Sequence, residues 1–448
     1  FDSFFHELSD RGQFNGNVLI AEGNQIIFHK AFGYADFEKK KKLTTKSVFE
    51  LASLSKQFTA MAIMILKERG ELAYEDDMNS YLPTQLPYKN ISIRHLLSHT
   101  SGLPDYQELF EQHWDKTKIA DNADILSMLA KFHPPVLFNP GESYKYSNTG
   151  YVLLASVVET VSQMPFDRFL KENIFIPLQM VDTAIYTKEA VKKIDNYAFG
   201  YMYSLSDSKY LLTDDIPSKS YVYYLSGRFG PGRMSSTTFD LYKWDRALYT
   251  EKLVSKATLV EAFTPMKTTN LQTDYGFGWH IIENDESEKA VFHTGTWGGY
   301  LNYIKRFIDE DKTIIILTNN HQIAYIKQIR IAAEQILYNQ PFQTPKISIV
   351  ERLSNNLINQ DEIALNKQFN QLIADSGTYY LDENELADLG NELIDIDKAK
   401  QAVSVFQIYA SENPSSWKVY DGLARAYALA GENKLAVENR NKAEKLKN

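Results

Sequence analysis

Two short apolar runs near the start of the chain flank a polar turn. Residues 18–21 and 26–29 are rich in β-branched and other large apolar side chains, and residues 22–24, which include a glycine, separate them. Such side chains fit a pleated strand, and a Gly-containing turn between two such runs is typical of a β-hairpin. We therefore expect the chain to form its first strands here.

A helical pattern follows, beginning at Ser53. Apolar residues recur at intervals of three and four through residues 58–66, and Gly70 comes just after the charged residues 67–69. These intervals place the apolar side chains on one face of a helix, and a glycine past the last periodic residue is a common helix stop. The pattern predicts a helix that starts at Ser53, and a shorter helix at residues 2–8.

Strand patterns return late in the chain. The runs cover residues 275–282, 290–293, 300–308 and 313–317, and a helical pattern follows at about 324–338. Between about residues 75 and 265, helical stretches alternate with long irregular segments. A two-stranded hairpin buries its own apolar face poorly. We therefore expect one sheet built from both ends of this region, with a helical insertion covering one edge. Two separate domains in series are the alternative.

Beyond residues 340–345, the pattern becomes almost purely helical. The positions Leu386, Leu389, Gly390 and Ala402 recur 34 residues later as Tyr420, Leu423, Ala424 and Ala436. This period, with small residues where two helices would cross, resembles the tetratricopeptide repeat. The sequence therefore predicts two domains, 1–340 and 341–448, of which the second is built of helical hairpins. Those hairpins either bind a protein partner or form a docked structural cap.

Composition narrows the function classes. The 448 residues are 44% hydrophobic and 13% aromatic, as in a globular protein, and the formal net charge is -9. Nucleic-acid binding needs a concentrated positive surface, which this balance does not favour. One basic run occurs, at residues 39–42, and we expect it to lie in a solvated turn.

The chain contains no cysteine, which excludes disulfides, thiolate catalysis and cysteine metal sites. No stretch approaches the roughly 18 consecutive apolar residues that a membrane span requires. The sequence starts at Phe1 rather than Met. A removed secretory signal and a trimmed N-terminus both explain this start.

Ser53 and Lys56 form an S-x-x-K pattern at the start of the predicted helix. Helical spacing puts both side chains on one face, and a serine hydroxyl becomes a nucleophile only when a base takes its proton. Two other pairs, 206/209 and 415/418, fit the same pattern but lack this helix start and the downstream partners described next.

Three further motifs follow Ser53 in order. They are the string IRHLLSHTSGLP at 93–104, the tripeptide YSN at 146–148 and the tripeptide HTG at 293–295. Y-x-N also occurs at 88–90 and 300–302, so that tripeptide is weak alone, whereas HTG occurs once, at the end of a predicted strand.

Together and in this order, these motifs resemble the serine β-lactamase and penicillin-binding protein superfamily, in its class C-like branch. That branch includes class C β-lactamases, D-aminopeptidases, D-Ala-D-Ala carboxypeptidases and family VIII esterases. The resemblance spans about residues 5 to 335, with further matches at residues 232–237, 240–244 and 275–279. It implies an α/β (α+β) fold in which an antiparallel sheet from the N- and C-terminal parts carries helices on its faces. Helical tails are common appendages in part of this family.

The resemblance also implies catalytic roles. Ser53 would be the nucleophile, and Lys56 and Tyr146 would jointly act as the base for acylation. Tyr146 would then protonate the leaving group and help activate the hydrolytic water. The backbone N–H groups of Ser53 and Thr296 would form the oxyanion hole, and Asn148 would bind a substrate amide or Lys56.

The substrate-binding strand would contain His293, Thr294 and Gly295. The penicillin-recognising branch usually has lysine where this chain has His293. Histidine, with an ordinary pKa near 6.5, is largely neutral at pH 7 and offers a hydrogen bond rather than a fixed charge. This difference favours esters or D-amino-acid amides over β-lactams and peptide carboxylates.

The sequence thus predicts a serine hydrolase with an acyl-enzyme intermediate, acting on small ester, amide or peptide substrates. Alternatives are a β-lactamase or D-Ala-D-Ala carboxypeptidase, and a non-catalytic sensor or binding protein. We expect no cofactor and no metal, since the pair His95 and His99 lacks the glutamate of H-E-x-x-H and a third ligand. A periplasmic or secreted bacterial location, with the signal absent from this chain, fits the family. The substrate and the oligomeric state stay open.

Overall fold

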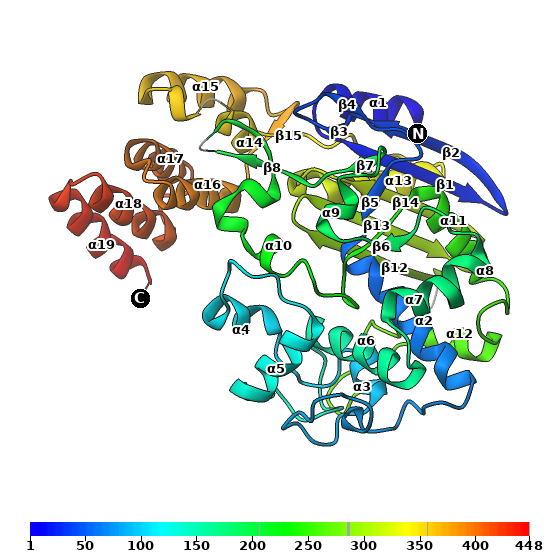
Figure 1. Ribbon diagram of the computed structural model, residues 1–448. Coiled ribbons are helices and arrows are strands. Elements are labelled where there is room, and N and C mark those ends of the chain that lie inside the picture. The colour runs from blue at the N-terminus through cyan, green and yellow to red at the C-terminus, as the bar shows by residue number, and fades with distance from the viewer. Residues whose placement is uncertain (206, 285–286, 356, 448) are drawn as a thin grey trace. The chain divides into compact units, whose positions relative to one another are not determined.

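The computed structural model describes residues 1–205, 207–284, 287–355 and 357–447. These residues pack as two compact units (Figure 1). The first comprises Phe1–Met202 and Leu212–Ile323, and the second comprises Tyr203–Leu211 and the chain from Ala324 onward. The predicted domain boundary after residue 340 stays a prediction.

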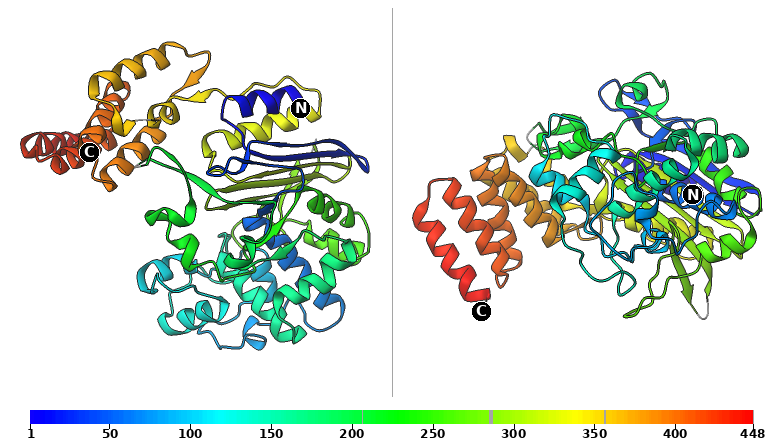
Figure 2. Two further views of the ribbon diagram at one scale, coloured as in Figure 1. Left: turned by 45° about the horizontal axis from the view of Figure 1, so that its top comes forward. Right: turned by 60° about the horizontal axis from the view of Figure 1, so that its bottom comes forward.

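A six-stranded antiparallel sheet forms the centre of the first unit. Its order is β11-β12-β13-β14-β1-β2. The strands are β1 (Gly16–Glu22), β2 (Gln25–Phe32), β11 (His280–Asn284), β12 (Ser287–Trp297), β13 (Tyr300–Phe307) and β14 (Lys312–Thr318). β1 pairs with β2 on one side and with β14 on the other, so that the first and last strands of the unit lie side by side (Figure 1, Figure 2). The prediction of one sheet built from both ends of this region is therefore confirmed.

Burial explains why the hairpin joins the later strands. Every residue of β13 is buried, as are the β1 residues up to Ala21, whereas β2, at the edge of the sheet, is exposed or half-buried at every residue before Phe32. β14 pairs with the second edge of β1 and makes it an inner strand, and α11 packs against both strands, so the apolar side chains of β1 are buried.

The segment between β2 and β11 supplies most of the helices of the first unit. The helices of the unit are α1 (Asp2–Asp10), α2 (Ser55–Glu68), α3 (Ile93–Leu97), α4 (Tyr106–His113), α5 (Asn122–Phe132), α6 (Asn148–Ser162), α7 (Phe166–Leu170), α8 (Ile176–Leu178), α9 (Lys188–Val191), α10 (Tyr221–Tyr224), α11 (Thr238–Ala247) and α12 (Lys256–Ala262). α2 is buried along almost its whole length and packs against α6, while α11 packs against β14 and β1.

A second, small sheet leads directly to Ser53. Its order is β6-β10-β5-β7. The strands are β5 (Val48–Glu50), β6 (Ala184–Ile185), β7 (Tyr197–Ala198) and β10 (Met234–Ser236). They are two or three residues long, so their sequences carry too few positions for a periodic signal. Another short pair, β3 (Tyr34–Asp36) and β4 (Lys41–Lys42), takes up the second half of the basic run at 39–42.

One strand prediction was wrong in its first half. Residues 275–279 do not join the sheet, because β11 begins at His280. Gly278 has a positive φ of 78° and lies so close to the backbone of α2 that a Cβ would meet the Lys56 carbonyl oxygen at 2.9 Å. The segment is therefore a loop that packs on the start of α2, which apolar and aromatic composition alone does not reveal.

The second unit consists mainly of helices. They are α13 (Ile323–Leu337), α14 (Ile349–Ser354), α15 (Glu362–Ala374), α16 (Glu383–Asp395), α17 (Ala399–Glu412), α18 (Trp417–Leu429) and α19 (Asn433–Lys447), with short strands β15 (Ile347–Ser348) and β16 (Tyr379–Tyr380). The 34-residue repeat places equivalent residues on α16 and α17 and on α18 and α19, which form two antiparallel hairpins (Figure 2). Gly390 and Gly422 leave room for the Phe406 ring where α16, α17 and α18 meet. The tetratricopeptide likeness stays a prediction.

Across the described parts of the chain, no helix is both long enough and apolar enough to traverse a bilayer.

A buried ion pair joins α11 to the main sheet and predicts a large effect on stability. Arg306 of β13 donates through Nε to the Asp245 carboxylate, and both side chains are fully buried. We expect Asp245→Asn to lower the free energy of unfolding by about 3–5 kcal/mol, because it leaves the guanidinium without its counter-charge. Urea denaturation measures this change.

The matched control is Asp10→Asn, at the exposed end of α1, which should change the unfolding free energy by less than about 0.5 kcal/mol. Equal stability of Asp245→Asn and Asp10→Asn would show that the pair is not needed.

Candidate active site

Ser53 lies in a tight turn between β5 and α2. The turn is a 3₁₀ segment, η1 (Ala52–Leu54). Ala52 adopts a positive φ of 50°, which is uncommon for a residue with a Cβ and typical of functional sites. The helix predicted to begin at Ser53 thus begins two residues later, at Ser55, and Ser53 itself is half-buried.

Lys56 is fully buried and contacts three oxygen atoms. Its Nζ lies 3.2 Å from Ser53 Oγ, 2.9 Å from Asn148 Oδ1 and 3.1 Å from the Pro231 carbonyl oxygen. The amide and carbonyl oxygens can only accept hydrogen bonds. A neutral amine would satisfy both with its two N–H groups and direct its lone pair at the Ser53 hydroxyl.

The electrostatic surroundings favour that neutral amine. Burial lowers the pKa of Lys56 well below its ordinary value, Asp105 opposes the change and Arg228 adds to it. Desolvation penalises an ammonium group because the interior solvates charge less well than water. Lys56 is therefore much closer to being a base near neutral pH than a free lysine is.

Tyr146 is shifted in the opposite direction. Burial raises the pKa of its phenol above the ordinary value, and a hydrogen bond with Ser53 opposes the rise only in part. Lys56 Nζ lies 4.7 Å from the centre of the Tyr146 ring. The phenol therefore stays protonated, which suits a proton donor better than a base.

The two histidines of the string at 93–104 have separate structural roles. His95 accepts a hydrogen bond from the Ser92 backbone N–H at the start of α3. His99 packs its ring 4.2 Å from that of Tyr146 and accepts a hydrogen bond from the Ser147 N–H at 3.1 Å. In the parts of the chain that the structure describes, no three His, Asp or Glu side chains are grouped to hold a metal.

Asp105 is a site residue that the sequence reasoning missed. Its carboxylate accepts from Asn148 Nδ2 at 2.8 Å and from the Gln107 N–H at 3.0 Å, the latter at the start of α4. It therefore orients the Asn148 amide so that Oδ1 faces Lys56. Its position directly after the string at 93–104 was the available signal.

β12 approaches the Ser53 turn very closely at Gly295. A Cβ at this position would lie 2.3 Å from the Leu51 carbonyl oxygen and 3.0 Å from a methyl carbon of Leu54. Only glycine lets the strand come this near. The third residue of the HTG motif thus sets the spacing between β12 and the turn that holds Ser53.

His293 uses both ring nitrogens within the protein. Nδ1 lies 2.6 Å from the Thr294 carbonyl oxygen, an acceptor, so Nδ1 carries the proton. Nε2 then accepts from the Tyr275 hydroxyl at 2.9 Å. Burial lowers the pKa of His293 well below its ordinary value, so the ring is neutral. The expected hydrogen bond from His293 to substrate stays a prediction.

Most of the predicted site residues open on one cavity of about 590 Å³. It is lined by Ala52, Ser53, Gln107, Tyr144, Tyr146, Asn148, Tyr221, Arg228, Pro231, His280, His293, Thr294, Thr296, Trp297, Gly298 and His321. Lys56 reaches this group through Ser53 and Asn148, and Gly295 lies between Thr294 and Thr296 on β12. The structure therefore brings all eight predicted residues together, although their roles stay predictions.

The competing motif matches lie elsewhere. Ser206 falls outside the described residues, and Ser415 lies before α18 in the second unit. The phenols of Tyr88 and Tyr300 donate to backbone carbonyls of Pro134 and Ala198.

Of the three tyrosines of α10, one lines the Ser53 cavity and two do not. Tyr221 lines the cavity with Ser53, Tyr223 is 39% exposed, and Tyr224 is buried and donates to Glu111.

Comparison with known proteins identifies relatives of the first unit. The family model described as Beta-lactamase matches residues 1–333. Penicillin-binding protein 4* of Bacillus subtilis (strain 168) is 45% identical over 347 residues, which cover 77% of this chain and 77% of that protein.

Solved structures agree in fold. The octameric penicillin-binding protein homologue from Pyrococcus abyssi superposes with a TM-score of 0.66 at 26% identity, covering 76% of this chain and 77% of that one. The D-amino acid amidase from Ochrobactrum anthropi SV3, complexed with L-phenylalanine amide, gives 0.62 at 24% identity, covering 75% of this chain and 96% of that one. The second likeness shows the fold alone.

The close approach at Gly295 predicts that this position tolerates no side chain. We expect Gly295→Ala to push β12 away from the Ser53 turn and to reduce covalent labelling of Ser53 by a fluorophosphonate at least tenfold. Gly377→Ala, where an added Cβ meets nothing closer than 3.5 Å, is the matched control. Normal labelling of Gly295→Ala, measured by intact mass, would mean that the spacing is not critical.

Proposed function

The chain belongs to the beta-lactamase family of serine hydrolases, and on this premise we propose that it hydrolyses small esters or D-amino-acid amides through an acyl-enzyme on Ser53. One observation carries the proposal. The buried Lys56 amine has two acceptors for its N–H groups and the Ser53 hydroxyl as its third neighbour, at 3.2 Å. This arrangement suits a base that removes the serine proton.

The proposed acylation begins with proton transfer from the Ser53 hydroxyl to Lys56, while Oγ attacks the substrate carbonyl carbon. The backbone N–H groups of Ser53 and Thr296 stabilise the negative oxygen of the tetrahedral intermediate. Tyr146 gives its phenolic proton to the leaving group and regains a proton from Lys56. Because the pKa of Tyr146 is raised and that of Lys56 is lowered, we assign the base to Lys56 and the donor to Tyr146.

Deacylation follows the same proton path in reverse. Water gives a proton to Tyr146 as the phenol passes its own proton to Lys56, and the resulting hydroxide attacks the acyl carbon. Ser53 Oγ then leaves and takes the proton from Lys56. Asn148, held by Asp105, keeps the lysine in place through both steps.

The neutral His293 supports esters and amides as substrates. A substrate carboxylate would gain no charge pairing from this ring, since both nitrogens are used within the protein. One protein of the same fold is named a D-amino acid amidase, which agrees with amides as a substrate class. A penicillin-binding carboxypeptidase or β-lactamase is the second candidate, favoured by the 45% identity to penicillin-binding protein 4*.

We further propose a location outside the cytoplasm, supported by the relationship to penicillin-binding proteins. The helical hairpins would contribute a surface for a protein partner. A cavity of about 530 Å³ within the second unit, between residues near α15, α17 and α18, supports such binding.

Labelling tests the nucleophile. A fluorophosphonate should add one covalent group to the wild-type protein, and Ser53→Ala should remain unlabelled, as measured by intact mass. Ser415→Ala removes the other described S-x-x-K serine and should label like the wild type. An unlabelled wild type would favour the non-catalytic sensor, and equal labelling of Ser53→Ala would place the nucleophile elsewhere.

A parallel rate panel tests the substrate class. Short-chain aryl esters and D-amino-acid amides should turn over faster than a chromogenic cephalosporin or a dipeptide ending in D-Ala-D-Ala. If the cephalosporin were fastest, the argument from His293 would be wrong.

The role of Lys56 predicts a shifted pH profile. For a neutral ester, kcat/KM should fall as the pH drops through the lowered pKa of Lys56, because the amine must be unprotonated to act as a base. This fall in kcat/KM is the acid limb of the pH profile. Asp105 favours the protonated lysine, so Asp105→Asn should move the acid limb to lower pH. The amide oxygen of the introduced asparagine can still accept from Asn148.

Asp10→Asn, far from the cavity, is the control and should leave the limb in place. A limb that stays in place in Asp105→Asn, or moves to higher pH, contradicts Lys56 as the base.

A further inference from the structure

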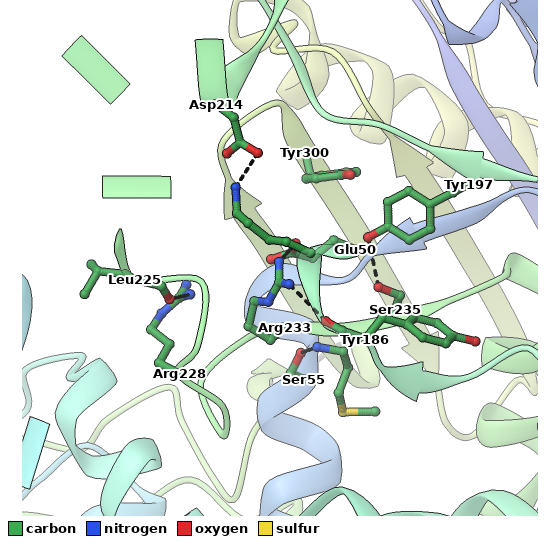
Figure 3. A network of polar contacts seen from close by, with 12 residues as sticks. Glu50, Ser55, Tyr186, Tyr197, Asp214, Leu225, Arg228, Arg233, Ser235 and Tyr300 are labelled. Carbon is green, nitrogen blue, oxygen red and sulfur yellow. Dashed lines mark hydrogen bonds and ion pairs between the residues drawn. The ribbon is translucent and has the colours of Figure 1, made fainter. Parts of the chain in front are cut away.

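Arg228 is a buried cation that pairs with no carboxylate in the described part of the chain. The residue is only 4% exposed, and its Nη1 donates to the Leu225 carbonyl oxygen at 2.8 Å (Figure 3). Among the residues that the structure describes, no Asp or Glu forms an ion pair with it, and its buried Nε has no hydrogen-bond partner. Removing an unpaired charge from water is costly, so such a group is rare unless it has a function.

Arg233, in the same segment, is a buried arginine whose contacts are those of a purely structural residue. Its Nη1 donates to Glu50 at 2.7 Å and its Nη2 to the Tyr186 carbonyl oxygen at 3.0 Å (Figure 3). Two arginines five residues apart are thus both buried, but among the described residues only Arg233 has a carboxylate partner.

The unpaired guanidinium belongs to the wall of the Ser53 cavity. Arg228 and Trp297 both line it, and the centre of the guanidinium lies 3.7 Å from the Trp297 ring centre. Tyr221 packs its edge against the same indole at 4.9 Å. Stacking and the bond to Leu225 fix the plane of the group before any ligand arrives.

The other titratable residues of this wall carry no charge near pH 7. Burial lowers the pKa of each of the three lining histidines, His280, His293 and His321. Among the described lining residues, none is Asp, Glu or Lys, and Arg228 is the only arginine. The nearby Asp105 has its carboxylate occupied by amide donors. Arg228 therefore gives the cavity a fixed positive charge.

On the premise of the proposed function, we propose that Arg228 binds a carboxylate of the substrate, so that the preferred esters or amides carry one negative charge. A planar guanidinium can form two parallel N–H···O bonds with a carboxylate. The bond would pair the buried charge and hold the substrate beside Ser53. The substrate's negative charge would thus be recognised from the loop before β10, and not from the HTG strand, where His293 is neutral.

Two pairs of esters test this inference and locate the carboxylate. The first pair compares p-nitrophenyl hydrogen succinate, which has a carboxylate on its acyl group, with the uncharged p-nitrophenyl butyrate. The second pair compares 3-carboxyphenyl acetate, which has a carboxylate on its leaving group, with the uncharged methyl ester of the same compound. We expect the wild type to prefer the charged member of at least one pair in kcat/KM.

Arg228→Gln should reduce that preference about 10- to 100-fold, as expected for loss of a charge-assisted hydrogen bond. Arg228→Lys should keep part of it, because the charge remains while the fork is lost. Arg168→Gln, which removes an exposed arginine on α7, should keep all of it.

A wild type without preference in either pair, or an unchanged preference in Arg228→Gln and Arg228→Lys, overturns the inference. Labelling by a neutral fluorophosphonate separates this failure from that of the proposed function. A labelled wild type without charge preference defeats only the role of Arg228, whereas an unlabelled wild type defeats the serine hydrolase itself. Labelling of Arg228→Gln also shows that the variant has folded with an intact Ser53.

Discussion

The burial of Lys56 is the constraint on which the rest of the site depends. An amine enclosed among the Ser53 hydroxyl, the Asn148 amide and the Pro231 carbonyl is stable only if each neighbour is held in place. α6 holds Asn148, the segment before β10 holds Pro231, and the turn before α2 holds Ser53. Three distant stretches of the chain must therefore pack together before the lysine can be a base.

Close backbone approach provides that packing. Gly295 brings β12 against the Ser53 turn, and Gly278 brings the loop 275–279 against the start of α2. In both places a carbonyl oxygen occupies the space that a Cβ would need. Because the strand contacts the Ser53 turn and the loop contacts the first residues of α2 that follow it, the nucleophile is fixed by backbone rather than by flexible side chains.

The same burial determines which groups of the cavity are neutral and which are charged. Desolvation favours the neutral forms of Lys56, Tyr146 and His293, which leaves proton transfer as the chemistry available to them. Arginine keeps its proton even when buried. Arg228 is thus the group in this wall that can attract an anion, and the reacting residues and the proposed binding residue differ in kind because burial acts on them differently.

Much of this protein followed from local sequence. The hairpin, α2 and the late strands were predicted because apolar periodicity reports burial, and the ordered S-x-x-K, YSN and HTG motifs marked residues that the fold brings together. Only the tertiary structure decided the rest. Asp105 and Arg228 carry no periodic signal, since their importance depends on which groups face them across the cavity. The loop 275–279 has the composition of a strand, and only the structure shows that its Gly278 packs against α2. Sequence patterns record which residues are buried, whereas partnership between distant polar groups is set by packing.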